Sequence, residues 1–280
     1  MERDQDVTQE RAPAARRRRR PRIAAALTVL VLVAVLAVVG VALFADDAPG
    51  APVARSEPLL PDLAMAPIED IAVGVTESGE QRLRFAATIV NVGEGPLLVR
   101  AERSLLGGSW TVDQWIAERS GGYSLLRTPA DLIFGGDGHD HWHVEQVEVH
   151  QLETLDGTIL GRLVKQGFCF FDTDAYEPSL AAAPERAHWG AKGCNPLLGT
   201  RVRMGLSVGW GDKYPWHLLD ERIDVTGLAD GTYRIRQIAD PNGEFEELDE
   251  TNNETWVDVE LTTTGDGLRE TTILEAGPPP

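Results

Sequence analysis

The chain has 280 residues, of which 42% are hydrophobic, enough to build the core of one large domain or two small ones. Its formal net charge is −18; residues 1–22 hold eight Arg against four acids, a net of +4, so residues 23–280 carry −22. A body this acidic argues against nucleic acid as a partner and favours cationic ligands, either amines or metal ions.

The first element expected along the chain is a transmembrane helix at residues 23–45. The basic run Arg16–Arg20 precedes this stretch, IAAALTVLVLVAVLAVVGVALFA, which contains no charge and is long enough to span a bilayer. Arginines on its N-terminal side predict a basic cytoplasmic tail at 1–22 and an extracytoplasmic domain on a single-pass cell-membrane protein. A cleaved export signal is the alternative, because small residues follow at Ala42 and Ala45, and the domain would then be secreted.

Beyond this segment the sequence predicts a linker, one all-β domain and a flexible tail. Residues 46–60 are rich in Pro and Ala, as extended linkers are. Period-two alternation in TYRIRQIAD (232–240) and TWVDVEL (255–261) indicates half-buried strands. LRFAATIVNVGEGPLLVR (83–100) and IDVTGLADGTY (223–233) each indicate two strands joined by a turn. The expected fold is a β-sandwich with long functional loops at 61–265, with one short helix around Asp113–Arg119 and a flexible tail at 266–280.

Two cysteines, Cys169 and Cys194, lie in the part of the chain expected outside the cytoplasm. In an oxidising compartment they can form a disulfide, and closing a loop of this length stabilises a fold by about 3 kcal/mol. A pair of buried thiols is the alternative.

The stretch GGDGHDHWH (135–143) gathers three of the six histidines at alternate positions. On a strand His139, His141 and His143 would project from one face and could meet a single ion. Three neutral imidazoles suit copper, zinc, nickel or iron better than magnesium or calcium. The pattern therefore predicts a metal site but leaves the metal open, and a polar strand face exposed to solvent is the alternative.

Four segments, in the same order along the chain, resemble the lysyl oxidase family. They are HDHWH (139–143), VKQGFCFFDT (164–173), WGDKYPWHLLDERIDVTGL (210–228) and DPNGEFEELDETNN (240–253). The resemblance covers roughly residues 60–260. It implies a copper amine oxidase, with copper on the three histidines, that oxidises primary amines to aldehydes and releases ammonia and hydrogen peroxide.

The resemblance also implies a cofactor made from the protein itself. Carried over position by position, Lys165 and Tyr214 are the precursors of a lysyl tyrosylquinone, because an oxidised phenol ring accepts an amine nucleophile. The chain uses 23 Arg but only three Lys, so a lysine between apolar neighbours at 165 is unusual for it. His150 and Asp212 are the candidates for the base that removes the substrate α-proton. Strand parity would turn His150 away from the copper unless a bulge intervenes.

A structural Ca²⁺ site is implied by the same resemblance, joining the start of the domain to its acidic segment. Carboxylate, amide and carbonyl oxygens are the ligands that Ca²⁺ takes. An acidic turn in which Asn caps its own backbone is the alternative. The matching positions are Asp62, Leu63 through its carbonyl oxygen, Glu247, Asp249, Asn252 and Asn253.

The chain departs from the animal enzymes of this family, which are rich in disulfides, and its segment between Thr173 and Gly193 is divergent. The resemblance therefore does not define how the substrate enters or which amine it is, and small amines, polyamines and protein lysine side chains all fit. One alternative function is a non-catalytic copper-binding β-sandwich module, which has no need of the Lys–Tyr pair. Another is a His₃ zinc hydrolase with Glu145 as general base. His188 and His217 match no family position and are expected at the surface, near the rim of the site.

Overall fold

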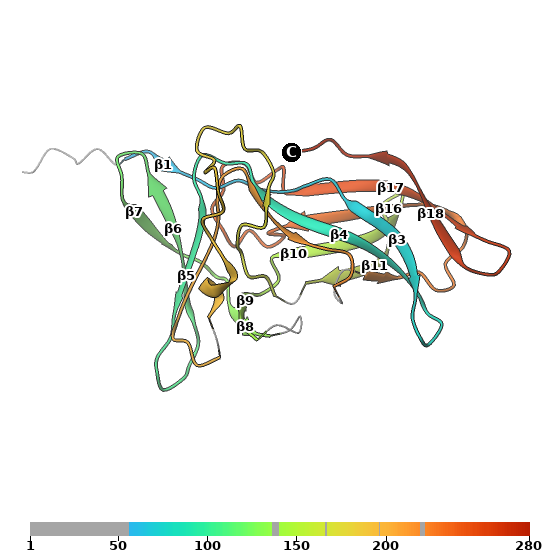
Figure 1. Ribbon diagram of the computed structural model, residues 1–280, viewed down its shortest axis with the longest axis horizontal. Coiled ribbons are helices and arrows are strands. Elements are labelled where there is room, and N and C mark those ends of the chain that lie inside the picture. The colour runs from blue at the N-terminus through green and yellow to red at the C-terminus, as the bar shows by residue number, and fades with distance from the viewer. Residues whose placement is uncertain (1–55, 136–139, 166, 196, 219–221) are drawn as a thin grey trace, which may run out of the picture. The chain divides into compact units, whose positions relative to one another are not determined.

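The computed structural model of the protein describes residues 56–280, apart from 136–139, 166, 196 and 219–221. The expected N-terminal tail and membrane segment therefore lie outside the described residues. Within the described part no helix has the length and apolar character needed to cross a membrane. Ser56–Pro280 forms one unit, and the strand pairs in it are antiparallel, as expected for an all-β domain (Figure 1).

The first sheet, on the left of Figure 1, has five strands in the order β1-β6-β5-β13, with β7 paired to β6. Its core-facing positions are apolar at every second residue of β5, at Leu97, Val99 and Ala101, as a half-buried sheet requires. The strands are β1 (Pro58–Leu59), β5 (Leu97–Glu102), β6 (Thr111–Glu118), β7 (Tyr123–Arg127) and β13 (Arg201–Leu206).

The strand β6 shows that the helix expected around Asp113–Arg119 is wrong. Its buried residues are Val112, Gln114 and Ile116, which repeat every two positions. Gln114 conceals this alternation in the sequence because it is polar although its side chain is buried. Burial is possible because the side-chain amide donates to the carbonyl of Glu246 and accepts from its N–H, each at 2.8 Å.

The second sheet, on the right of Figure 1, has the order β11-β10-β16-β17-β18. The long strands β16 and β17 confirm the two period-two patterns expected in this part of the sequence. The strands are β10 (Glu148–Thr154), β11 (Ile159–Val164), β16 (Gly231–Ala239), β17 (Glu254–Thr263) and β18 (Arg269–Ala276).

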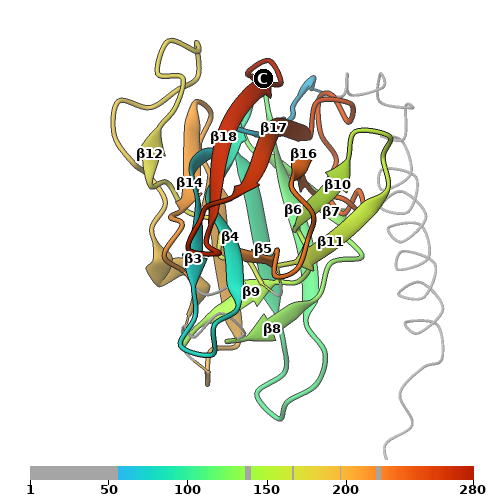
Figure 2. The same ribbon diagram turned by 90° about the vertical axis from the view of Figure 1, so that its right-hand side faces the viewer.

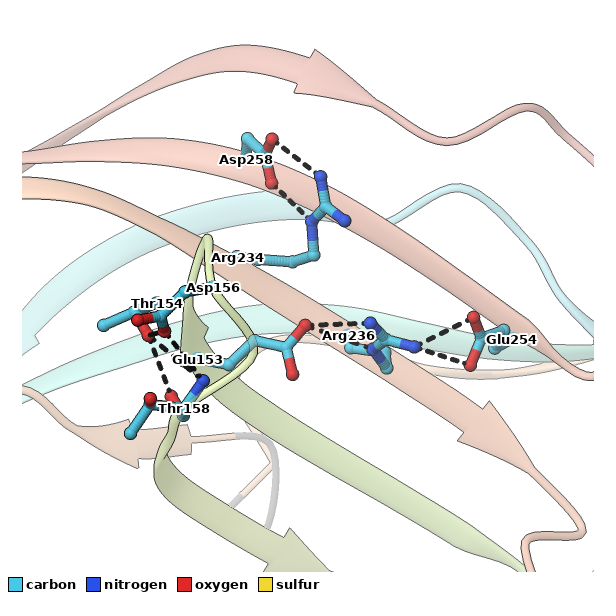
Figure 3. Close-up of polar contacts among 8 residues, drawn as sticks. All are labelled: Glu153, Thr154, Asp156, Thr158, Arg234, Arg236, Glu254 and Asp258. Atoms are coloured by element: carbon cyan, nitrogen blue, oxygen red, sulfur yellow. Dashed lines mark hydrogen bonds and ion pairs between the residues drawn. The ribbon is translucent and has the colours of Figure 1, made fainter.

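One face of this second sheet is polar and carries ion pairs, which Figure 3 shows in close-up. Arg236 bridges Glu153 of β10 and Glu254 of β17, with N–O distances of 2.9 Å to each. Arg234 makes a two-pronged contact with Asp258 at 2.7 and 2.9 Å. Partly exposed pairs of this kind contribute up to about 1 kcal/mol each. Successive side chains of a strand point to opposite faces. The residues next to these charged ones along each strand therefore face the interior.

The third sheet is organised around the long strand β4, which Figure 2 shows with β3 and β14 beside it. Leu83 and Phe85 of β4 pack against Leu152, Ile235 and Val257 of the second sheet, so the two sheets face each other across an apolar core. The strands are β2 (Leu63–Met65), β3 (Glu69–Val75), β4 (Gln81–Asn91), β12 (Asp174–Ala175), β14 (Trp210–Tyr214) and β15 (Arg222–Asp224). A separate hairpin joins β8 (Leu132–Phe134) to β9 (Trp142–Val144), and a 3₁₀ helix spans Ala191–Cys194.

At both ends of the domain, strands extend into segments that were expected to be irregular. The strand β18 fills most of the segment 266–280 that was expected to be a flexible tail, because its main chain pairs with β17. Its side chains are mostly exposed, so the sequence carries only a weak apolar signal there. At the other end β1 belongs to the expected linker 46–60 and pairs with β6 instead.

The disulfide expected between Cys169 and Cys194 is confirmed, with a Cα–Cα distance of 6.0 Å. Both cysteines are fully buried, and they tie the segment between β11 and β12 to the 3₁₀ helix. A disulfide of this kind indicates an oxidising, extracellular environment.

Replacing both cysteines by alanine should lower the free energy of unfolding by about 3 kcal/mol, because the unfolded chain then regains the entropy of the open loop. Urea unfolding of the double variant measures this. Unfolding of the reduced wild-type protein is the control and should show a similar loss. A loss below about 0.5 kcal/mol would show that the bridge adds nothing beyond ordinary surface effects.

Candidate active site

Strands β10 and β11 bring three polar side chains to the inner face of the second sheet. Glu148 and His150 are two residues apart on β10 and are both 0% exposed. Lys165 follows β11 directly, and its backbone N–H donates to the Glu148 carbonyl at 3.0 Å, continuing the register in which Val149 pairs with Val164. Residues opposite each other in antiparallel strands project from the same face, so the side chains of Lys165 and Glu148 lie on one side of the sheet.

Strand β14 contributes two side chains from the opposing sheet. Asp212 and Tyr214 are two residues apart, share one face of the strand and are both buried. Tyr214 pairs with Ala87 of β4, and Phe85, two residues along β4, contacts the ring of His150 edge-on with centroids 5.1 Å apart. The two inner faces therefore meet at this point.

Lys165 and Tyr214 lie against each other. The Nζ atom of Lys165 is 3.4 Å from the centroid of the Tyr214 ring and 5.8 Å from that of Phe168. The rings of Phe168 and Tyr214 are 4.7 Å apart, so Phe168 packs beside the pair. A lysine ammonium over the face of an aromatic ring is attracted by the ring quadrupole, and more strongly where water is excluded. The two residues expected to form the quinone are thus in contact.

Asp212 lies in a setting that changes its acidity. Burial raises the pKa of this carboxyl well above its usual value; the N–H of Phe171 and the charge of Lys165 oppose the rise, and the charges of Glu148 and Asp172 add to it. Its Oδ2 accepts a hydrogen bond from the Phe171 N–H at 3.2 Å. Its buried Oδ1 has no hydrogen-bond partner among the described residues. Such a carboxyl can hold or release a proton at a less acidic pH than an exposed one.

Two of the three expected metal-binding histidines can be located. His143 lies within β9, and His141 precedes that strand by one residue. Their rings are tilted toward each other with centroids 4.5 Å apart, and His143 is 0% exposed. His139 lies outside the described residues. Within the described part of the chain no three His, Cys, Asp or Glu side chains form a group that could hold one metal ion. The adjacent imidazoles fit copper by donor type.

A turn after β9 changes the strand parity counted from His143. Gln146 has a φ of 58°, and the backbone N–H of Glu145 donates to the carbonyl of Asp131 at 3.0 Å. Glu145 therefore lies in a turn, and its expected alignment with the histidine face does not follow from strand geometry. For the same reason His150 lies on the inner face of β10, although parity counted from His143 turned it away.

A pocket of about 530 Å³ joins His141 to Asp212 and Tyr214. Two carboxyl groups, those of Asp140 and Asp212, line the pocket, and its exposed lining is largely apolar. Lys213 also lines it, and its Nζ pairs with Glu69 at 2.7 Å. The remaining lining residues are Phe171, Ala191 and Leu218. Neither His188 nor His217 lines this pocket, and both are exposed, as expected.

The positions expected to bind Ca²⁺ come together at the start of the domain. Asn252 donates to Asp62 at 2.8 Å, Asn253 donates to Glu247 at 2.9 Å, and the N–H of Leu63 also donates to Glu247. Asp249 is near enough for its charge to raise the pKa of Asp62, after the larger effect of burial. The side-chain oxygens of both asparagines are buried without a hydrogen-bond partner among the described residues. Carboxylate and amide oxygens are the donor types that a hard cation takes.

Glu148 is the residue at this site that the sequence analysis did not single out. A charged residue in a strand ordinarily faces solvent, so EVHQLET (148–154) gives no reason to place it inside. The signal that could have found it is its spacing from Leu152 and from His150, both of which share its face. Predicting that Glu148 lies opposite Lys165 requires the strand register, which the sequence alone does not give.

Comparison with known proteins gives a distant and partial relationship. No family model matches the chain. It is 31% identical over 118 residues to lysyl oxidase homolog 2 of Xenopus laevis, 30% over 116 residues to lysyl oxidase homolog 3A of Danio rerio, and 29% over 116 residues to lysyl oxidase homolog 3 of Homo sapiens. These matches cover 41–42% of this chain but only 14% of each relative. The chain is therefore distantly similar to lysyl oxidase homologues over part of its length.

Gly167 should be essential for the position of His143. A Cβ atom added at 167 would lie 2.5 Å from the Cβ of His143, closer than such atoms approach, and 3.3 Å from a methyl of Ile133, which is a tight contact. Gly167→Ala should therefore displace the imidazole and weaken copper binding by about tenfold or more, as measured by titration of the copper-free protein. Gly265→Ala is the matched control because nothing lies within 4 Å of its Cβ. Equal affinities in both variants would show that His143 does not contribute.

Calcium should stabilise the domain more at about pH 8 than at about pH 5. Burial raises the pKa of Glu247 from 4.5 to about 8, against the hydrogen bonds from Leu63 and Asn253. The folded state thus keeps a proton that the unfolded state has lost, so stability falls as the pH rises from 4.5 to about 8. A cation can replace that proton, and melting curves with and without Ca²⁺ test this.

Glu247→Gln should remove most of this Ca²⁺ response, whereas Glu270→Gln, at an exposed site on β18, should keep it. A response that is the same at both pH values, or unchanged in the Glu247 variant, would contradict a Ca²⁺ site here.

Proposed function

We propose that this protein is an extracytoplasmic, copper-dependent amine oxidase. It takes up a primary amine, O₂ and water and releases an aldehyde, ammonia and hydrogen peroxide. The observation that carries the proposal is the contact between the Lys165 amine and the Tyr214 ring, 3.4 Å from Nζ to the ring centroid. A quinone cofactor needs this amine and this ring within bonding reach, whereas a metal-binding module has no use for the pair.

Copper and the quinone have fitting residues at the site. His141 and His143, with His139, would hold copper, and Lys165 and Tyr214 would form the lysyl tyrosylquinone. When bound, the metal and the cofactor supply the two-electron oxidation of the amine and the return of the electrons to O₂. The buried position of Lys165 and Tyr214 keeps bulk water away from that chemistry.

The chain's own carboxylates bind the substrate and move its proton. The Asp140 carboxylate lines the pocket and attracts an ammonium group, while Phe171 and Leu218 offer apolar contacts to an alkyl chain. We assign removal of the α-proton to Asp212, because it lines the pocket and burial raises its pKa. His150 was the other candidate, but it is 0% exposed and does not line the pocket.

The substrate is a cationic primary amine. The net charge of −18 favours such a ligand over an anionic one at long range. A pocket of about 530 Å³ accommodates a small amine, a polyamine or the side chain of a protein lysine. All three substrates have an ammonium group for the acidic lining and an alkyl chain for the apolar lining.

The remaining parts of the proposal concern architecture and location. The facing second and third sheets form a β-sandwich, with the pocket at the end of β14 and the segments beside it. Residues 23–45 anchor the chain in the cell membrane, with the catalytic domain outside and no nucleic-acid partner. A Ca²⁺ ion on the Asp62 and Glu247 cluster holds the start of the domain to its acidic segment.

Tyr214→Phe and Lys165→Ala should each retain copper but form no quinone. The phenylalanine ring lacks the hydroxyl that oxidation requires, and the alanine lacks the amine that adds to the ring. The visible quinone absorption and the redox-cycling stain should be absent. Peroxide release with a panel of primary amines should fall by about a thousandfold or more.

Two matched controls accompany these variants. Lys192→Ala removes an exposed lysine of the 3₁₀ helix, and Tyr123→Phe removes a phenol on β7 that is 51% exposed. Both should behave like the wild type. Full oxidase activity in the Tyr214 or Lys165 variant would refute the assignment.

A further inference from the structure

Glu148 lies at the centre of the buried polar cluster, and the proposed chemistry leaves it without a role. We propose that Glu148 is the proton acceptor in cofactor assembly. Its carboxylate takes the proton that the Lys165 ammonium must lose before its nitrogen can bond to the oxidised Tyr214 ring. This inference rests on the proposed function.

The strand register supplies the geometry. The backbone N–H of Lys165 donates to the carbonyl of Glu148 at 3.0 Å, which sets the two residues opposite each other on β11 and β10. Their side chains therefore leave the sheet on the same side. That side is the interior, because Glu148 is 0% exposed and Lys165 is 1% exposed. The Lys165 amine reaches the Tyr214 ring from this position.

The proton transfer is needed because an ammonium nitrogen has no lone pair with which to attack the oxidised ring. The Lys165 nitrogen therefore needs a proton acceptor on its own side of the sheet, and the register places the carboxylate of Glu148 there. In this step the Nζ–H bond breaks, an O–H bond forms on Glu148, and the electron pair stays on nitrogen. No oxidant or reductant takes part.

The other groups that face Glu148 have different positions. His150, on the same strand, has its Nε2 3.7 Å from the Glu148 carboxylate and can pass the proton on. Asp212 comes from the opposing sheet and lines the substrate pocket, with one oxygen engaged by the Phe171 N–H. Both Lys165 and Glu148 act on the pKa of Asp212, which puts the three charges in one cluster.

On β16, the residues paired with His150 and Glu148 are Gln237 and Ala239, neither of which is charged. Glu148 is thus the carboxylate that shares a sheet and a register position with Lys165.

Strand β10 also provides a matched control carboxylate. Glu153 is likewise buried, with 5% exposure, but it points to the opposite face and pairs with Arg236 (Figure 3). Glu153→Gln therefore removes a buried acid from the same strand without touching the cluster around Lys165.

The test follows quinone formation in the full chain rather than turnover. Copper-free wild type, Glu148→Gln, Glu148→Asp and Glu153→Gln are loaded with Cu²⁺ in air, and the rise of the visible quinone band is timed across a range of pH. We expect all four to bind the same amount of copper. Glu148→Gln should form the band about tenfold or more slowly near neutral pH and recover as the pH rises, because hydroxide then removes the proton. Glu148→Asp should be slowed less, and Glu153→Gln not at all.

The outcomes separate the two proposals. If the wild type forms no band with copper and air, the proposed function fails whatever Glu148 does. If the wild type forms it and Glu148→Gln matches its rate and pH profile, the role of Glu148 is overturned while the amine oxidase stands. An equal slowing at every pH, with a lower melting temperature, would reduce Glu148 to a structural residue. Should Glu148→Gln not fold, a Glu148→Asp rate equal to that of the wild type overturns the proposal.

Discussion

A lysine amine held against the face of a tyrosine ring, in a core that excludes water, is the contact on which the rest of the site depends. Each partner comes from a different sheet: Lys165 from the end of β11 and Tyr214 from the end of β14. Neither strand could set the distance alone, so the packing of the two sheets fixes it. The apolar cluster around Phe85, Leu152 and Ile235 holds those sheets together.

The interior between these sheets is unusually polar for a β domain. Glu148, His150, Lys165 and Asp212 are all at least 99% buried, and burying such groups costs stability unless they are paired. The fold offsets this cost with a continuous apolar core and with the Cys169–Cys194 bridge. Placing the groups on strands rather than on loops also keeps their spacing rigid, as a site that forms its own cofactor requires. The same burial raises the pKa of Asp212, so structure and chemistry share one cause.

Much of the fold follows from the sequence, because alternation along β16 and β17 directly reflects burial of one face. Alternation does not reveal a strand where a buried residue is polar, as at Gln114 in β6. It also does not reveal an edge strand such as β18, which buries few side chains. The residues of the site likewise divide into those that were expected before the structure and one that was not. Lys165 and Tyr214 are 49 positions apart, so their contact was expected only from a family resemblance, whereas Glu148 needed the register of two strands.

The most direct test of the account is peptide mapping by mass spectrometry of the protein after loading with copper in air. We expect the peptide containing Lys165 to be covalently joined to the peptide containing Tyr214, with the mass change of an amine bonded to an oxidised phenol ring. The same digest of copper-free protein kept without oxygen should give two separate peptides. Separate, unmodified peptides from the fully copper-loaded, aerated protein would contradict the account, because the contact between amine and ring would then have no chemical consequence.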